Sequence, residues 1–284
     1  MISNIGIIVI FFNPTEDCVD HFLNLAHAGF PVAIGNNGMK ENYLNKLNGE
    51  KNISIVGEGL NIGLAAALNN CIKFCTHKLG VSSLVLFDQD SKPKVELPVE
   101  LERSFKFLQS IGNPACVGPL LLDRKMTGKS YLKNEDKYLI VDTIATSGTY
   151  IPTDVLKKVG LMMEGLFIDC IDHEWCFRAR NLGFEIYVDQ INSMEHDMGE
   201  NGVNWFGKYK PVYKSPIRHY YIVRNSVYMM RLNYVPLLWK FSESLKLIRR
   251  IGFYIIFSDG PIRTIKNILR GVTHGVLGQL GALH

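Results

Sequence analysis

Apolar strands alternate with helical segments through the first ninety residues, and this alternation constrains the fold more than any other feature. Residues 5–12 (IGIIVIFF) form a continuous apolar run, typical of a strand buried on both faces of a parallel sheet. Residues 17–29 follow with helical spacing and end at Gly29. The same patterns predict strands at 31–35, 52–56 and 82–88, and helices at 40–47 and 63–80. This order predicts an α/β fold with a Rossmann-like, open, twisted and mostly parallel sheet flanked by helices.

The composition fits a globular protein in a reducing compartment. The chain has 284 residues, of which 47% are hydrophobic, enough for a large core. Its six cysteines are scattered without a C-x-x-C pair, and no basic leader with a cleavage site opens the sequence, so we expect free thiols and a cytoplasmic location. No run reaches the roughly 18 uninterrupted apolar residues that span a bilayer.

Charge is distributed unevenly along the chain. Residues 201–284 carry 13 Lys and Arg against Glu243 and Asp259, a net charge of +11, whereas residues 1–200 sum to −7. From residue 236 onward, apolar residues recur at helical spacing among the basic ones. This pattern predicts a basic amphipathic helical extension over 231–284, behind a catalytic domain over 1–230, that meets an anionic membrane surface or packs on the domain as ordinary helices. No nucleic-acid-binding motif accompanies the charge, so nucleic acid is not expected as a partner.

Two carboxylates follow the strand predicted at 82–88. In the stretch LVLFDQDS (84–91), Asp88 and Asp90 stand one residue apart. Ligands of open parallel sheets bind outside the carboxyl ends of the strands, so these carboxylates and the asparagines that end earlier strands, Asn13 and Asn36, should converge on one crevice. Two such carboxylates can share a divalent cation when a nucleoside diphosphate supplies further oxygens.

Two other chemistries fit this region less well. A phosphatase of the haloacid dehalogenase type requires Thr or Val at the position of Lys92. A dinucleotide-binding turn requires G-x-G-x-x-G, whereas Gly57, Gly59 and Gly63 are spaced one residue too widely and follow the third strand.

A second acidic cluster opens a helix within FIDCIDHEWCFRAR (167–180). Asp169 and Asp172 stand at or before its first turn, where the helix dipole favours anions. Glu174 and Arg178 are four residues apart and can form an ion pair. A zinc site of the HExxH kind is excluded, because the second histidine is absent.

Six segments in order resemble the family 2 inverting glycosyltransferases of GT-A fold, and rhamnosyltransferase-like members most closely. They are GIIVIFFNP, NIGLAAALNNCI, LVLFDQDS, TSGTYIP, LFIDCIDHEWCFRARNLG and HYYIVRN, and they span about residues 5–230. The resemblance implies a metal-dependent transfer of L-rhamnose from dTDP-L-rhamnose to a polyprenyl-diphosphate-linked glycan, in bacterial O-antigen or capsular polysaccharide synthesis. Such an enzyme would lie at the inner face of the cytoplasmic membrane.

The resemblance also implies roles for individual residues. Asp172 would be the general base, Asp90 and His196 would hold Mg²⁺ or Mn²⁺, and Glu174 and Trp175 would line the acceptor pocket. The donor would be bound by Asn13, Asn36, Asn61, Gly63, Asp88, Ser147, Gly148, Arg224 and Asn225.

One departure from the family leaves the donor open. Many members have aspartate where this chain has Asn36, and that aspartate reads the pyrimidine N3–H. The Asn36 amide oxygen can accept the same hydrogen bond without the charge. A UDP-hexose or another nucleotide sugar therefore stays an alternative donor, and a non-catalytic sugar-nucleotide-binding protein is an alternative of a different class.

Overall fold

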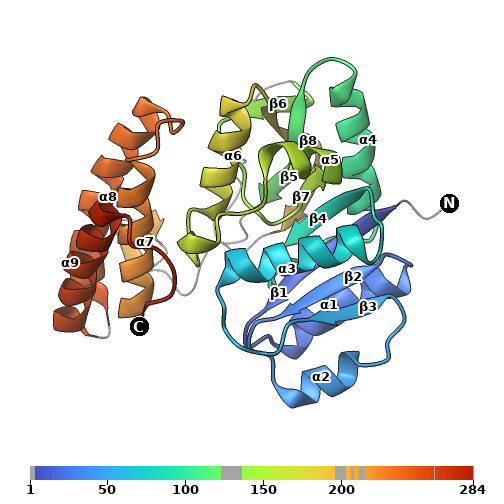
Figure 1. The fold of residues 1–284 in the computed structure, drawn as a ribbon, viewed down its shortest axis with the longest axis horizontal. Helices are drawn as coiled ribbons and strands as arrows, with labels where there is room; N and C mark the ends of the chain where they lie inside the picture. The colour runs from blue at the N-terminus through green and yellow to red at the C-terminus, as the bar shows by residue number, and fades with distance from the viewer. Residues whose placement is uncertain are drawn as a thin grey trace.

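The computed structural model describes residues 4–122, 136–195, 203–205, 208–210, 215–258 and 260–283. Strands and helices alternate through its first third, as the sequence predicts (Figure 1). They are β1 (Ile5–Phe11), α1 (Glu16–His27), β2 (Val32–Asn36), α2 (Glu41–Leu47), β3 (Ile53–Val56), α3 (Leu64–His77) and β4 (Ser83–Phe87). Every residue of β1 is buried, which explains its uninterrupted apolar sequence.

The second part of the chain completes a mixed sheet. Its elements are α4 (Leu97–Gln109), β5 (Pro114–Leu122), β6 (Tyr138–Val141), β7 (Thr149–Pro152), α5 (Thr153–Val159), the 3₁₀ turn η1 (Glu164–Leu166), α6 (Ile171–Asn181) and β8 (Glu185–Glu195). The strand order is β3-β2-β1-β4-β7-β5-β8-β6. Strands β1 to β4 pair in parallel, as do β5 and β8, whereas β7 and β6 are antiparallel to their neighbours. A separate two-stranded pair joins β9 (Val203–Trp205) and β10 (Lys208–Lys210). The predicted α/β sheet flanked by helices is confirmed.

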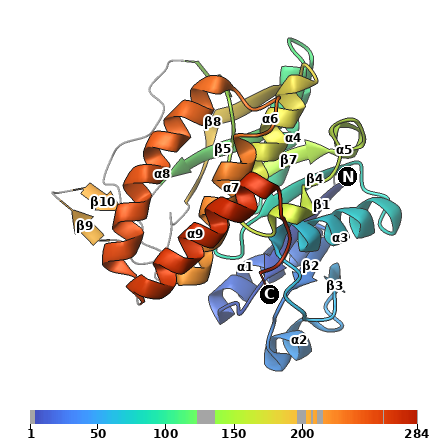
Figure 2. The ribbon, with the colours of Figure 1, turned by 60° about the vertical axis from the view of Figure 1, so that its left-hand side comes forward.

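Three helices form a unit beside the sheet (Figures 1 and 2). They are α7 (Pro216–Met229), α8 (Leu237–Phe257) and α9 (Pro261–Leu277). None of the helices in the described ranges is long and apolar enough to cross a membrane. The predicted domain boundary after residue 230 falls between α7 and α8, and it stays a prediction because α7 packs closely against α9.

Two glycines explain how closely α9 approaches α7. A Cβ added at Gly271 would lie 2.8 Å from the carbonyl oxygen of Tyr220, and one added at Gly275 would lie 2.7 Å from that of Arg224. The two helices therefore meet backbone to backbone. By contrast, a Cβ added at Gly252 in α8 would meet nothing within 4 Å.

We expect Gly275→Ala to destabilise the protein by about 1–3 kcal/mol, because overpacking against the α7 backbone outweighs the gain of about 1 kcal/mol in helix propensity. Gly252→Ala is the matched control and should be neutral or stabilising, since only the propensity changes. Urea unfolding of both variants measures the difference. Equal stabilisation by both would mean that α9 does not contact α7 in this way.

Candidate functional site

The ends of β1, β2 and β4 form one edge of the sheet, here called the carboxyl edge. Parallel pairing sets Phe11 opposite Asn36, and it places β4 on the other side of β1. Gln89, which stands between the two aspartates, accepts a hydrogen bond from the Phe12 main-chain N–H at 2.9 Å. The structure therefore brings Asn13, Asn36 and Asp88 to one edge, as the sequence predicts.

Asparagines connect β2 to the glycine-rich loop 57–63. Asn37 donates to Asn61 Oδ1 at 3.2 Å and accepts from the Ile62 N–H at 2.8 Å. The Asn61 oxygen also accepts from the N–H of Gly63, which precedes α3. One predicted donor-binding residue, Asn61, thus contacts Asn37, which directly follows Asn36, and it also holds the N–H of a second one, Gly63.

The Asn36 amide oxygen is already engaged within the chain. It accepts from the Met39 N–H at 3.0 Å and from the Gly38 N–H at 3.4 Å. A pyrimidine N3–H would compete with these two bonds for the amide oxygen, and the predicted contact with it stays a prediction. The amide nitrogen of Asn36 is left as the group that can face a base carbonyl.

Asp88 and Asp90 lie on a turn directly after β4. The Ser91 N–H donates to the Asp88 carbonyl at 3.1 Å and closes this turn. Asp90 is exposed, and its carboxylate makes no hydrogen bond or ion pair with the described residues. Hard carboxylate oxygens suit Mg²⁺ or Mn²⁺. In the described ranges no three His, Cys, Asp or Glu side chains cluster as a metal site, and His196 lies outside those ranges.

Ser147 and Gly148 pack against this turn. The buried Ser147 hydroxyl is hydrogen-bonded to that of Ser91, and the Gly148 N–H donates to the Leu86 carbonyl of β4 at 2.7 Å. Gly148 has φ +80°, and a Cβ there would lie 2.7 Å from the Pro119 ring. Only glycine fits this position without strain. The structure therefore brings these two predicted donor residues next to the carboxylates.

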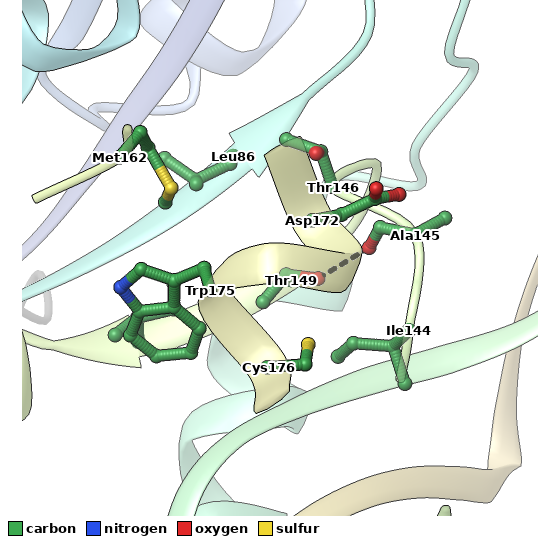
Figure 3. Close-up of a pocket in the computed structure, with 10 residues that line it drawn as sticks. Leu86, Ile144, Ala145, Thr146, Thr149, Met162, Asp172, Trp175 and Cys176 are labelled. Carbon is green, nitrogen blue, oxygen red and sulfur yellow. Dashed lines mark hydrogen bonds between the residues drawn. The ribbon is translucent and has the colours of Figure 1, made fainter. Parts of the chain in front are cut away.

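Asp172 is the second residue of α6, and it reaches the same region from the opposite side. Its Oδ1 accepts from the His173 N–H at 2.8 Å, and the half-buried side chain lines a small hollow together with Ala145, Thr146 and Leu86 (Figure 3). Thr146 directly precedes Ser147, and Leu86 belongs to β4. Asp172 thus lies near β4, the strand that Asp88 and Asp90 follow.

Asp169 is a second carboxylate near the start of α6. Its backbone is left-handed, with φ +67°, and its Oδ2 is buried without a hydrogen-bond partner. Burial raises the pKa of Asp169, while Arg218, whose Nη2 lies 3.4 Å from Oδ1, opposes the rise. Asp169 is thus enclosed and paired with Arg218, whereas Asp172 lines the hollow, which makes Asp172 the more accessible of the two candidate bases.

Glu174 and Trp175 are both buried in the structure. Glu174 is 0% exposed, binds Arg178 through two hydrogen bonds of 2.8 and 2.9 Å, and accepts from the Tyr234 hydroxyl at 2.6 Å. Burial, and then the adjacent Glu174, raise the pKa of Tyr234 well above its usual range. Trp175 donates to the Gly160 carbonyl and lines the same hollow as Asp172. Their contact with an acceptor stays a prediction.

Arg224 and Asn225 are also fully buried. Within the described chain, their side chains hydrogen-bond to each other, to main-chain carbonyls of residues 165–169 and to Gly281. They therefore reach the loop before α6, whereas a contact with the diphosphate stays a prediction.

Phe12 is a candidate that the sequence analysis missed. Residues 5–12 were assigned to one buried strand, but β1 ends at Phe11 and the Phe12 ring is 47% exposed beside Gly38. An aromatic residue between a strand end and an asparagine was the available signal. An exposed aromatic face at this edge can stack on a planar base.

No protein-family model matches the chain. One curated relative, the dTDP-rhamnosyl transferase RfbF of Shigella flexneri, is 28% identical over 298 residues. The match covers 100% of this chain and 96% of the relative.

Solved structures share the fold at lower identity. TarS 1–349 of S. aureus in complex with UDP-GlcNAc has a TM-score of 0.51 at 14% identity, covering 97% of this chain and 92% of that one. GalNAc-T7 with UDP, GalNAc and Mn²⁺ has a TM-score of 0.53 at 14% identity, covering 87% of this chain. This chain spans 54% of the GalNAc-T7 chain and 44% of a longer TarS structure. The predicted resemblance is confirmed at the level of a glycosyltransferase with the GT-A fold.

We expect Glu174→Gln to lower the free energy of unfolding by about 3 kcal/mol, because it leaves the Arg178 guanidinium without its buried counter-charge. Glu102→Gln is the matched control, since the Glu102 partner Lys106 is 66% exposed, and it should change stability by less than about 0.5 kcal/mol. Thermal unfolding measures both. Equal melting temperatures would mean that Glu174 does not support the fold and is free for an acceptor.

Proposed function

We propose that this GT-A-type glycosyltransferase transfers L-rhamnose from dTDP-L-rhamnose, with inversion, to a lipid-linked oligosaccharide in bacterial O-antigen or capsular polysaccharide synthesis. The observation that carries the proposal is the full-length similarity to an RfbF named as a dTDP-rhamnosyl transferase. The meeting of Asp172, Ser147 and the Asp88–Ser91 turn around the end of β4 supports it.

The donor would lie along the carboxyl edge. The Phe12 ring offers a stacking face for the base, and the Asn36 amide nitrogen can donate to a base carbonyl, which thymine and uracil both carry. Asp90, with Asp88 beside it and His196 as a further candidate, would hold a divalent cation, which would stabilise the negative charge of the departing diphosphate. A UDP-sugar is the second candidate donor, because a structure of the same fold, TarS, binds UDP-GlcNAc.

The reaction needs one proton acceptor. Asp172 would take the proton of the acceptor hydroxyl as its oxygen attacks the anomeric carbon, while the bond from that carbon to the diphosphate breaks on the opposite face. Attack from the face opposite the leaving group inverts the anomeric centre. The Asp172 side chain lies in the hollow beside Thr146, where the acceptor hydroxyl would approach it.

Asp172→Asn should lower kcat at least about 1,000-fold, because the amide cannot accept the proton. Binding of dTDP-L-rhamnose, measured as a rise in melting temperature with Mg²⁺ or Mn²⁺ present, should be preserved. Asp169→Asn is the control, and it should retain most of the activity.

Other outcomes have distinct meanings. Full activity of the Asp172 variant would assign the base elsewhere. Stabilisation of the wild type by nucleotide sugars without any transfer would indicate the non-catalytic binding protein, and indifference to all nucleotide sugars would overturn the proposal.

We also infer that the three-helix unit rests on an anionic membrane at its cytoplasmic face, where a polyprenyl-linked acceptor would be presented. Helix α8 exposes Leu237, Leu238, Phe241, Leu245, Ile248 and Ile256, and α9 exposes Ile262, Ile265, Leu269, Val272, Val276 and Leu277. Basic residues interleave with both sets: Lys240, Lys246, Arg249, Arg250, Arg263, Lys266 and Arg270. The acidic residue of these two described helices, Glu243, is buried and paired with Arg250.

The double variant Arg249→Glu/Lys266→Glu should lose most of its co-sedimentation with vesicles that contain anionic lipid at low salt. Each basic residue near such a surface contributes about 1 kcal/mol. Lys73→Glu/Lys78→Glu, at exposed positions of α3 and its C-cap, makes the same change in net charge and should bind like the wild type. Absence of wild-type binding, or equal loss in both variants, would contradict a membrane-facing role for α8 and α9.

A further inference from the structure

The loop that precedes α6 has an unusual backbone. Phe167, Asp169 and Cys170 have φ of +65°, +67° and +62°, although none of them is glycine. A positive φ is unfavourable for a residue with a Cβ. Three such residues within four positions hold their shape only where surrounding contacts fix them. The loop, residues 165–170, ends two residues before Asp172.

Side chains of α7 supply those contacts. The Asn225 amide nitrogen lies 2.9, 2.6 and 2.9 Å from the carbonyl oxygens of Leu166, Ile168 and Asp169. The Arg224 Nη2 donates to the carbonyls of Leu166 at 2.8 Å and Gly165 at 3.1 Å. Both side chains are 0% exposed. Loss of Asn225 would leave the carbonyls of Ile168 and Asp169 without this donor, and loss of Arg224 would remove one of the donors to the carbonyls of Gly165 and Leu166.

A third helical side chain and the segment after α9 complete the support. The Tyr221 ring stacks on Phe167 at 4.9 Å, and its hydroxyl accepts from the Leu283 N–H at 2.9 Å. The Gly281 N–H donates to the Gly165 carbonyl at 2.7 Å, while its own carbonyl accepts from Arg224. The loop is thus enclosed by α7 and residues 280–283.

The same loop touches the donor side of the site. The Phe167 carbonyl accepts from the Leu64 N–H of α3 at 2.6 Å. Gly63 packs on the Phe167 ring so closely that a Cβ there would lie 2.5 Å from it. Loop 165–170 therefore contacts the end of loop 57–63 on one side and leads into Asp172 on the other.

We propose that Arg224 and Asn225 are positioning residues for the transfer reaction. They hold loop 165–170 in its left-handed conformation and thereby set Asp172 relative to the donor. On this basis the three-helix unit serves catalysis directly, whether or not it meets a membrane. The inference rests on the proposed function, because it assigns the base to Asp172.

The test compares Asn225→Ala and Arg224→Lys with Leu108→Ala. Leu108 is a fully buried residue of α4, so its truncation lowers the melting temperature through a cavity away from α7. Activity is measured with a soluble acceptor analogue and no membrane, at a temperature where circular dichroism shows each variant folded. Asn225→Ala should lose about 100-fold in kcat, as expected for a misplaced catalytic group, and Arg224→Lys should lose less, with donor KM within about threefold of the wild type for both. Leu108→Ala should keep its kcat.

Hydrogen exchange supplies a readout that does not depend on activity. The Leu64 amide, bonded to Phe167, should exchange faster in the α7 variants than in Leu108→Ala. Arg224→Lys keeps the charge and replaces the planar guanidinium with a single ammonium group, so it should fold even if Asn225→Ala does not, and its kcat should lie between those of Asn225→Ala and the wild type. A kcat equal to that of Leu108→Ala, with Leu64 exchange unchanged, would overturn the positioning role. No transfer by the wild type would instead reject the proposed function.

Discussion

The parallel pairing of β1 with both β2 and β4 is the constraint on which the site depends. It brings three strand ends to one edge, so polar residues separated by some fifty positions of sequence become neighbours. Hydrogen bonds then fix that edge in detail: Gln89 joins the carboxylate turn to β1, and Asn37 joins β2 to loop 57–63. The chain places two like charges, Asp88 and Asp90, one residue apart at this edge, and carboxylate oxygens of this kind suit a divalent cation.

Sequence patterns predicted the order of strands and helices well, because strands buried on both faces of a sheet have continuous apolar sequences. The alternation of strands and helices up to β4 and the position of Asp88 and Asp90 after that strand are found in the structure. Ser147 and Gly148 entered only through the family resemblance, and the structure places them beside this turn. The predicted strand ended one residue too late, at Phe12, whereas β1 ends at Phe11 and Phe12 is exposed on the surface. An apolar residue can be the last residue of a buried strand or the first exposed residue after it. Hydrophobic periodicity therefore could not decide whether Phe12 is buried or exposed.

The remaining assignments depended on contacts between distant segments. Helical spacing predicted that Glu174 pairs with Arg178, and this pair is found. The second partner of Glu174, Tyr234, follows α7, sixty residues later, and no local sequence pattern predicts that contact. Likewise, the partners of Arg224 lie at residues 165, 166 and 281, so its orientation could not be read from HYYIVRN alone. Family resemblance suggested a role at the diphosphate, whereas the side chain packs between two tyrosine rings and a row of carbonyls.

The burial of Arg224 also limits how the molecule can move. Its guanidinium has no carboxylate partner among the described residues and is held by carbonyl dipoles and tyrosine faces. Sliding α7 away from loop 165–170 would strip those contacts from a charge already removed from water, which is costly. The sheet and the three helices are therefore expected to tilt and travel as one body. Any surface that α8 and α9 rest on would then fix the height of the reacting groups above it, and only acceptors long enough to reach that height could be extended.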